Sequence, residues 1–313
     1  MTPALQGEQS PPRAAAARPR RARASERARA YLSLTKPRVV ELLLVETLPV
    51  MILAAHGLPN PWAVVATLIG GSLSAGAASA FNCVIDRDID RVMHRTRNRP
   101  LVTGALTTRQ ALVFASVLTL VSTLILLTTT WLAAALSVTA IAFYVFVYTL
   151  WLKRRTEQNI IWGGIAGCFP VLIGWAAQTG TLAPAAFVLF GVVFLWTPPH
   201  YWPLSMRYRD DYAAAQVPML AVVRSRGQVG LQTVLYAWAT VACSLLLIPV
   251  AHVGPVYGIV ALGSGIWFIV ETHRLYADAI AGREPVPMRV FHASIGYLSL
   301  LFLAIAIDPL LFH

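Results

Sequence analysis

Residues 61–91 read PWAVVATLIGGSLSAGAASAFNCVIDRDIDR, an apolar run that ends in a cluster of acidic side chains. The run carries no charge before Asp86, and it exceeds the roughly 20 mostly apolar residues that a membrane-spanning helix needs. Similar runs recur along the chain, whose 313 residues are 57% hydrophobic and only 12% charged. Soluble domains carry roughly 25% charged residues. The composition therefore excludes a water-soluble globular enzyme and a disordered chain, and it indicates a polytopic membrane protein.

Nine segments have the length of a membrane span. Backbone polar groups must pair inside a bilayer, and runs of this length without strict alternation favour helices over a barrel. We therefore predict an all-α fold with nine transmembrane helices within residues 31–313. Residues 1–30, rich in Arg, Ala and Pro, are expected to form a disordered basic cytoplasmic tail. The nine segments are 38–57, 61–81, 110–130, 131–151, 159–178, 183–202, 229–251, 254–273 and 290–311.

The basic residues alternate between the ends of these segments. All 25 Lys and Arg lie in the tail or in every second connection, against 14 Asp and Glu in the chain, which has a net charge of +11. The positive-inside rule then predicts a cytoplasmic N-terminus and, with nine spans, a C-terminus outside. In so hydrophobic a chain the charge indicates anionic lipid or an anionic substrate, not nucleic acid. A bacterial inner membrane is favoured; the Arg-rich tail leaves a mitochondrial inner membrane open.

Two of the basic connections also hold clustered carboxylates. Asn82, Asp86 and Asp90 are spaced by four, so on a helix they share one face, while Asp88 points elsewhere. Oxygen ligands in this arrangement suit Mg²⁺, which is usually shared with substrate phosphates. Asp210 and Asp211 form the second cluster, after the sixth span. Together the clusters predict a metal-bound diphosphate site, although simple pairing with neighbouring Arg remains the alternative, above all for Asp88.

Other polar residues stand near these clusters or inside the spans. Arg makes bidentate contacts with phosphate and Lys a point-charge contact, although such residues can also simply face lipid. Pro198 and Pro199 are expected to break the sixth span before His200, which is either a packing residue or a functional one. Glu41 and Glu46 fall inside the first span, where carboxylates are costly. The candidates for the diphosphate are Lys36, Arg38, Arg95, Arg99, Lys153 and Arg154.

These motifs resemble a known family. Asn82-x-x-x-Asp86-x-x-x-Asp90, followed by residues 93–101, is similar to the first signature of the UbiA-type intramembrane prenyltransferases. Residues 34–38, 153–160, 196–202 (WTPPHYW) and 210–220 are closest to the haem O synthase (protohaem IX farnesyltransferase) branch of that superfamily. The chain departs from the pattern in its second motif, where Tyr208 and Tyr212 flank the acidic pair, and at Gln216 and Glu46.

The resemblance implies a helix bundle around a central cavity that opens to the cytoplasm and sideways into lipid. It implies transfer of a farnesyl group from farnesyl diphosphate to a vinyl group of haem B, with addition of water, to give haem O. The implied catalytic residues are Asn82, Asp86, Asp90, Asp210 and Asp211, and all of these except Asp210 are implied ligands of Mg²⁺. Candidate haem contacts are Trp196, His200 as an axial ligand, Tyr208 and Tyr212. The lipid bilayer and a downstream haem-modifying enzyme are the expected partners.

Three other functions stay open at this point. A prenyltransferase acting on an aromatic acid or quinone precursor would share the diphosphate half of the site. A multi-pass transporter would use Glu41 and Glu46 as a proton relay, but it would leave two carboxylate clusters on one face unexplained. A structural assembly factor for a haem-copper oxidase would not depend on Asp86.

Overall fold

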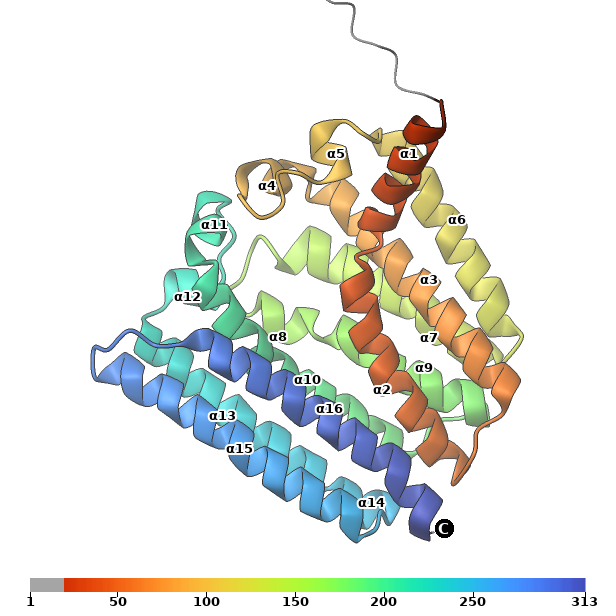
Figure 1. Cartoon of the computed structure of the whole chain (residues 1–313), viewed down its shortest axis with the longest axis vertical. Helices are drawn as coiled ribbons and strands as arrows, with labels where there is room; N and C mark the ends of the chain where they lie inside the picture. The colour runs from red at the N-terminus through yellow and green to blue at the C-terminus, as the bar shows by residue number, and fades with distance from the viewer. Residues whose placement is uncertain (1–19, 313) are drawn as a thin grey trace, which may run out of the picture.

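The computed structural model describes residues 20–312, without the side chains of 20–23, 38–44 and 312, and it is helical throughout this part of the chain (Figure 1). The all-α prediction is therefore confirmed. The elements are α1 (Arg20–Leu34), α2 (Pro37–Ala55), α3 (Pro61–Ile85), α4 (Arg87–Val92), α5 (Pro100–Thr103), α6 (Thr108–Leu127), α7 (Trp131–Ala142), η1, a π-helix (Phe143–Leu152), α8 (Asn159–Gly163), α9 (Ile165–Thr179), α10 (Pro184–Arg207), α11 (Arg209–Ala214), α12 (Leu220–Val223), α13 (Arg226–Leu245), α14 (Leu247–Ala251), α15 (Pro255–Ile280) and α16 (Pro287–Phe312).

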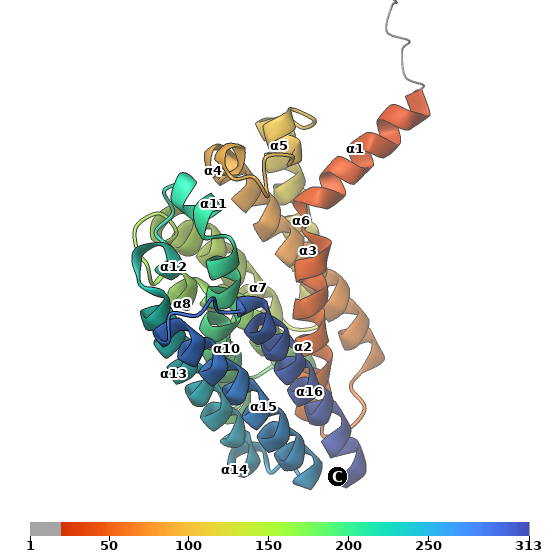
Figure 2. The ribbon, with the colours of Figure 1, turned by 60° about the vertical axis from the view of Figure 1, so that its left-hand side comes forward.

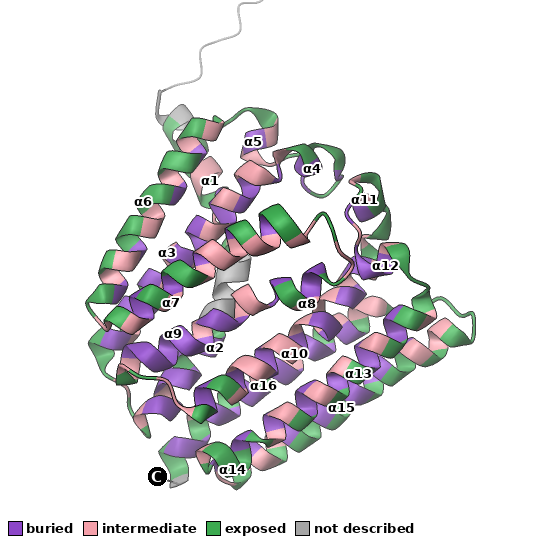
Figure 3. Cartoon of the chain, turned by 180° about the vertical axis from the view of Figure 1, so that it is seen from behind, coloured by how far each residue is buried: buried purple, intermediate pink, exposed green. Residues whose placement is uncertain are grey.

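Eight helical segments of the described chain are long and apolar enough to cross a membrane, by length and composition. They coincide with the second to ninth expected spans; η1 continues α7, α9 continues α8, and α14 continues α13. The first expected span corresponds to α2, which has 19 residues and an apolar segment Val45–Ala55 among its described side chains. Large apolar side chains such as Leu120, Trp131 and Ile259 are exposed on these helices. Figure 3 shows exposed residues along the outer helices. Such apolar side chains suit lipid contact.

Two sequence expectations are corrected. The tail was expected to be disordered to residue 30, but α1 begins at Arg20 because Ala and Arg, which dominate this stretch, are strong helix formers. Residues 1–19 lie outside the described residues. Pro198 and Pro199 do not break the sixth span, because α10 runs continuously to Arg207 with both prolines buried. Packing of α10 against α9, α13 and α16 offsets the low helix propensity of the two prolines.

Most of the short helices lie at one end of the bundle, whereas the short helix α14 lies near the C-terminus at the other. In Figures 1 and 2, α4, α5, α11 and α12 lie at the end where α1 meets α2, and the C-terminus lies at the opposite end. Small residues allow the long helices to approach closely: a Cβ on Gly70 of α3 would lie 2.8 Å from Leu126 Cγ of α6, and Ser122 Oγ donates to the Gly70 carbonyl at 2.8 Å. This close packing holds α3 against α6, and the first acidic cluster projects from the C-terminal end of α3.

Candidate functional site

The first acidic cluster lies where α3 passes into α4. Asp86 separates the two helices, and the amide of Asp90 donates to the Asp86 carbonyl at 2.8 Å, so the helical path continues through the junction. Asn82, Asp86 and Asp90 therefore share one face, as their spacing predicts. Their exposed fractions are 2%, 0% and 3%. A polar face this deeply buried is costly unless every group on it is paired.

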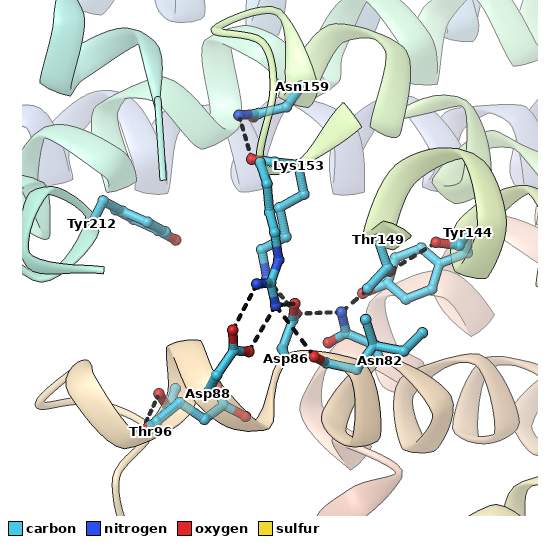
Figure 4. Close-up of polar contacts among 12 residues, drawn as sticks. Asn82, Asp86, Asp88, Thr96, Tyr144, Thr149, Lys153, Asn159 and Tyr212 are labelled. Atoms are coloured by element: carbon cyan, nitrogen blue, oxygen red, sulfur yellow. Dashed lines mark hydrogen bonds and ion pairs between the residues drawn. The ribbon is translucent and has the colours of Figure 1, made fainter. Parts of the chain in front are cut away.

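Basic side chains from other elements pair with the cluster (Figure 4). Lys36 Nζ donates to Asn82 Oδ1 at 2.9 Å, and Lys153 Nζ donates to Asp86 Oδ2. The Asn82 amide donates to Asp86 Oδ2 at 2.6 Å and to Thr149 Oγ1 at 3.3 Å. Two lysines far apart in sequence thus meet one buried carboxylate face.

Lys36 occupies an unusual backbone position between α1 and α2. Its φ of 49° lies in the left-handed region, which a non-glycine residue rarely adopts, and Pro37 after it disfavours an α-helical conformation at Lys36. The turn directs Lys36 Nζ onto Asn82. Burial lowers the pKa of Lys36 to about 8, because desolvation disfavours its charged form.

Two arginines bind the carboxylates of α4 on different sides. Arg99 Nη1 donates to both oxygens of Asp90, at 2.7 and 2.6 Å. Arg154 donates to both oxygens of Asp88, at 2.6 and 2.7 Å, and this hydrogen bonding lowers the pKa of Asp88 to about 2. The Asp88 side chain is 63% exposed, so it points away from the buried face as expected. Arg154 also comes within 3.8 Å of Asp86 Oδ1.

The second acidic cluster contacts the loop that follows α4. Asp211 accepts from the backbone amides of His94 and Arg95, both at 3.2 Å, and the Arg95 guanidinium lies 5.2 Å from the Tyr208 ring centroid. Tyr212 is buried and its hydroxyl hydrogen-bonds with Tyr201 at 2.8 Å. Burial raises the pKa of Tyr212.

The two connections are therefore joined, as the sequence predicts. Their carboxylates do not converge, because Asp211 meets backbone and not Asp86, and Asp210 is exposed. The side chain of Arg38, the remaining diphosphate candidate, lies outside the described residues, as does that of Glu41.

His200, grouped from the sequence with Tyr208 and Tyr212 as a candidate haem contact, packs against side chains other than these tyrosines. Its ring is stacked between Trp196, at a centroid distance of 4.2 Å, and Phe291, at 4.7 Å. Nδ1 hydrogen-bonds with Ser294 Oγ at 2.8 Å, and Trp196 Nε1 donates to the Ser294 carbonyl at 2.8 Å. Both ring faces are covered, so a ligand would have to approach His200 at its edge, through Nε2.

Sequence reasoning missed Thr149 and undervalued Asn159. Thr149 is buried in the π-helix, where its hydroxyl accepts from Asn82 and donates to the Tyr144 carbonyl at 2.8 Å. Asn159 is fully buried, its amide donates to the Lys153 carbonyl at 3.4 Å, and its Oδ1 has no partner. Thr149 carries no sequence signal within its apolar run, whereas Asn159 belongs to the stretch 153–160 quoted above.

The donor set suits a hard cation that arrives with a substrate. Asp86 Oδ1 is a buried oxygen without a hydrogen-bond partner, and Asn82 and Asp90 add further oxygens on the same face. Among the residues that the structure describes, no group of three His, Cys, Asp or Glu could hold a metal ion by itself. A metal at this face would need further ligands, such as substrate phosphates, which Mg²⁺ commonly shares with carboxylates.

Comparisons with known proteins agree with this geometry. The profile of the UbiA prenyltransferase family matches residues 43–295. The chain belongs to the UbiA prenyltransferase family. It is 68% identical over 289 residues to the "Protoheme IX farnesyltransferase" of Clavibacter michiganensis subsp. michiganensis, covering 92% of this chain and 94% of that one. The protein of the same name from Renibacterium salmoninarum is 59% identical, covering 90% and 89%.

Solved structures of UbiA proteins have the same fold. A digeranylgeranylglyceryl phosphate synthase superposes with a TM-score of 0.75 at 15% identity, over 92% of this chain and 100% of that one. A UbiA homologue from Archaeoglobus fulgidus, bound to GPP and Mg²⁺, superposes with a TM-score of 0.66 at 17% identity, over 90% and 99%. This UbiA family member is therefore a multi-span membrane prenyltransferase, and the transporter and assembly-factor alternatives are set aside.

Proposed function

We propose that this UbiA prenyltransferase transfers the farnesyl group of farnesyl diphosphate to a vinyl group of haem B, with addition of water, and so forms haem O and diphosphate. One observation carries the donor half: a buried carboxylate face, Asn82–Asp86–Asp90, is ringed by Lys36, Arg99 and Lys153. The acceptor half rests on relatives named protoheme IX farnesyltransferase at 68% and 59% identity over most of the chain.

The basic residues stabilise the leaving diphosphate. As the bond between C1 of farnesyl and the diphosphate oxygen breaks, negative charge grows on the diphosphate. Lys153 and Arg99 are held by the buried carboxylates of Asp86 and Asp90, and Lys36 is held by the amide oxygen of Asn82. These side chains therefore supply positive charge without reorganising. Arg95 and Arg154, at the edge of the buried carboxylate face, add positive charge near the diphosphate. Arg38 is assigned to the same group of residues from its sequence position alone.

Mg²⁺ fits the oxygen set of Asn82, Asp86 and Asp90, given the unpartnered Oδ1 of Asp86. When bound with the diphosphate, it would neutralise further charge on the leaving group. Asp211 was also expected to be a metal ligand, but it accepts hydrogen bonds from the backbone amides of residues 94 and 95. In this role it connects α11 to the loop that follows α4. Asp210 is exposed beside it. The homologue with GPP and Mg²⁺ supports this assignment.

The remaining steps need a dry site and a held acceptor. The farnesyl cation is quenched by water, so the helix walls must exclude water until the vinyl carbon has bonded to C1. Water then adds to the neighbouring carbon and loses a proton. The haem lies toward α10, with His200 Nε2 as its axial ligand and Trp196 beside it. Tyr208 and Tyr212 line the cytoplasmic approach.

The cellular setting follows from the same proposal. The protein sits in the inner membrane of a bacterium, like the bacteria from which the named relatives come. Its site opens to the cytoplasm, where the basic connections lie, and its product passes to a downstream haem-modifying enzyme.

The test is haem analysis in membranes that contain haem B but lack haem O. Wild-type protein is expected to yield a hydroxyethylfarnesyl haem by mass spectrometry, whereas Asp86→Ala yields none. Chelation of Mg²⁺ should abolish the product, and added Mg²⁺ should restore it. If folded wild-type protein with Mg²⁺ produces no new haem, the haem assignment fails, and aromatic prenyl acceptors become the substrates to test.

The axial role of His200 has its own test. His200→Ala should weaken haem binding and change the haem absorption spectrum of the purified protein. An unchanged affinity and spectrum would remove His200 from the haem site without affecting the diphosphate half.

A further inference from the structure

A basic cleft lies on the outer side of the acidic helix. Its volume is about 540 Å³, and we call it the arginine cleft after its lining residues Ile85, Arg87, Asp88, Arg91, Leu150 and Arg154. Arg87 and Arg91 are four residues apart on α4, so they share a face about 100° round the helix from that of Asp86 and Asp90. The side chains of Arg87 and Arg91 therefore point in a different direction from those of Asp86 and Asp90, so the arginine cleft adjoins the buried carboxylate face without sharing its carboxylates.

The charges in this cleft are unbalanced. Three guanidinium groups face one carboxylate, and that carboxylate, Asp88, is occupied by Arg154 through two hydrogen bonds. Across residues 20–312 no ion pair is found for Arg87 or Arg91, and Arg87 Nε is buried without a hydrogen-bond partner. A buried donor without an acceptor destabilises the protein unless a ligand supplies one. An anion in the cleft would supply such an acceptor and balance the excess positive charge.

The walls of the cleft indicate what carries that anion. Ile85 and Leu150 are apolar, and Leu150 is 49% exposed on η1, next to Trp151, which is 55% exposed. The cleft thus combines guanidinium groups, which bind phosphate through paired N–H donors, with an apolar wall at the end of a membrane span. Basic pockets between spans on this side of a membrane suit anionic lipid headgroups.

We propose that the arginine cleft binds the phosphate headgroup of a membrane amphiphile through Arg87 and Arg91, with the apolar chain against Ile85 and Leu150. This phosphate belongs either to an anionic phospholipid of the bilayer or to a prenyl diphosphate that waits outside the site. The proposal does not depend on the acceptor that the enzyme uses. It also gives Arg154 a second role, because Arg154 lines the cleft and lies 3.8 Å from Asp86 Oδ1.

The test compares two double variants of the full chain by native mass spectrometry. Arg87→Gln/Arg91→Gln removes two charges from the cleft; Arg97→Gln/Arg155→Gln removes two exposed charges from the same connections but outside the cleft. Each protein is titrated with phosphatidylglycerol, phosphatidylcholine and farnesyl diphosphate without Mg²⁺. We expect wild type and Arg97→Gln/Arg155→Gln to retain phosphatidylglycerol or farnesyl diphosphate, and Arg87→Gln/Arg91→Gln to bind it at least tenfold more weakly.

The ligand whose binding is lost in Arg87→Gln/Arg91→Gln, relative to wild type, distinguishes the two sources. Loss of phosphatidylglycerol binding alone identifies a phospholipid site, and loss of part of the farnesyl diphosphate binding alone identifies a waiting site for the prenyl donor beside the buried carboxylate face. Equal losses of ligand binding in both double variants would show that the effect comes from general surface charge, and they would overturn the proposal. Unchanged ligand binding in both double variants would overturn it as well.

A second variant covers the case in which Arg87→Gln/Arg91→Gln does not fold. Leu150→Gln changes only the half-exposed apolar wall, and it should weaken phosphatidylglycerol binding severalfold while leaving binding of glycerol 3-phosphate unchanged. Unchanged phosphatidylglycerol binding in Leu150→Gln would contradict the proposed position of the chain.

Discussion

Asp86 is the residue on which the buried face depends. It is fully buried, it accepts from both Lys153 and Asn82, and its second oxygen has no hydrogen-bond partner. Breaking a buried ion pair by removing one partner leaves the other charge uncompensated. Asp86 therefore holds Lys153 in place before the substrate arrives.

Asp86→Asn should nearly abolish prenyl transfer. The amide keeps the shape of the carboxylate but removes the charge that holds Lys153, and losses of one such electrostatic contact are on the order of 10²–10³-fold in rate. The measurement is release of diphosphate in vesicles. Asp278→Asn, whose carboxylate pairs with Arg283 at 2.7 Å far along the chain, is the control and should keep wild-type activity. Comparable rates for Asp86→Asn and wild type would exclude Asp86 from catalysis.

Replacement of a buried glutamate by methionine should have opposite effects on stability at Glu46 and at Glu271. Glu46 is 4% exposed and its Oε2 has no partner, whereas Glu271 is 6% exposed and its Oε1 accepts from Arg274 at 2.6 Å and Arg289 at 3.1 Å. An unsatisfied buried polar group costs about 1–3 kcal/mol. Thermal unfolding in detergent should show Glu46→Met stabilised and Glu271→Met destabilised. A destabilised Glu46→Met would mean that Glu46 has a partner in the folded protein.

At the scale of the element, the π-helix η1 (Phe143–Leu152) determines where the site residues point. Its wider turn lets Thr149 Oγ1 donate to the Tyr144 carbonyl, five residues back, while the same hydroxyl accepts from Asn82. Lys153 follows directly after the last turn. Such widened turns are frequent at functional sites, and here the turn aligns one hydroxyl and one ammonium with the carboxylate face.

Substitutions at Gly163 and Gly167 test how closely η1 packs against the helices that follow it. A Cβ on Gly163 would lie 2.2 Å from Tyr148 Cδ2, whereas one on Gly167 would meet nothing within 4 Å. Gly163→Ala should therefore destabilise the protein by about 1–3 kcal/mol, as overpacking does, and should lower activity by displacing η1. Gly167→Ala should be neutral or stabilising by up to about 1 kcal/mol, because Ala favours the helix. Thermal unfolding of both variants is the measurement; equal stabilities would contradict the close contact.

At the scale of the molecule, the two ends of the bundle differ. The short helices α4, α5, α11 and α12, with the acidic clusters, lie at one end, and the C-terminus lies at the other (Figure 2). Every Lys and Arg of the chain belongs to the tail or to the connections at the first end. Under the positive-inside rule that end faces the cytoplasm.

Reporter fusions check this orientation. Green fluorescent protein at the N-terminus should fluoresce, and alkaline phosphatase at the C-terminus should be active, because each reporter works on only one side of a bacterial inner membrane. Active phosphatase at the N-terminus, or an inactive one at the C-terminus of a correctly inserted protein, would reverse or refute the predicted topology.

The sequence predicted the fold class correctly, and it predicted that one group of candidate site residues would lie on the same face of a helix. Residues spaced by four on a helix must share a face, so Asn82, Asp86 and Asp90 were predictable as a group. Contacts between distant connections were not: Asp211 was expected near the metal but contacts the backbone at His94 and Arg95. Thr149 was missed altogether, because hydropathy does not distinguish a π-helix from an α-helix.

The sequence by itself determined that this protein is a helical membrane bundle with its Lys and Arg residues in the tail and in alternate connections. The reason is that the cost of unpaired backbone and charged groups in lipid depends only on composition and segment length. The tertiary structure alone decided which charges pair. Lys36 and Lys153 contact the Asn82–Asp86 face, while Arg87 Nε is left without a hydrogen-bond partner within the described part of the chain. Pairing depends on distances of a few ångströms between elements, and these distances are set by how the helices pack.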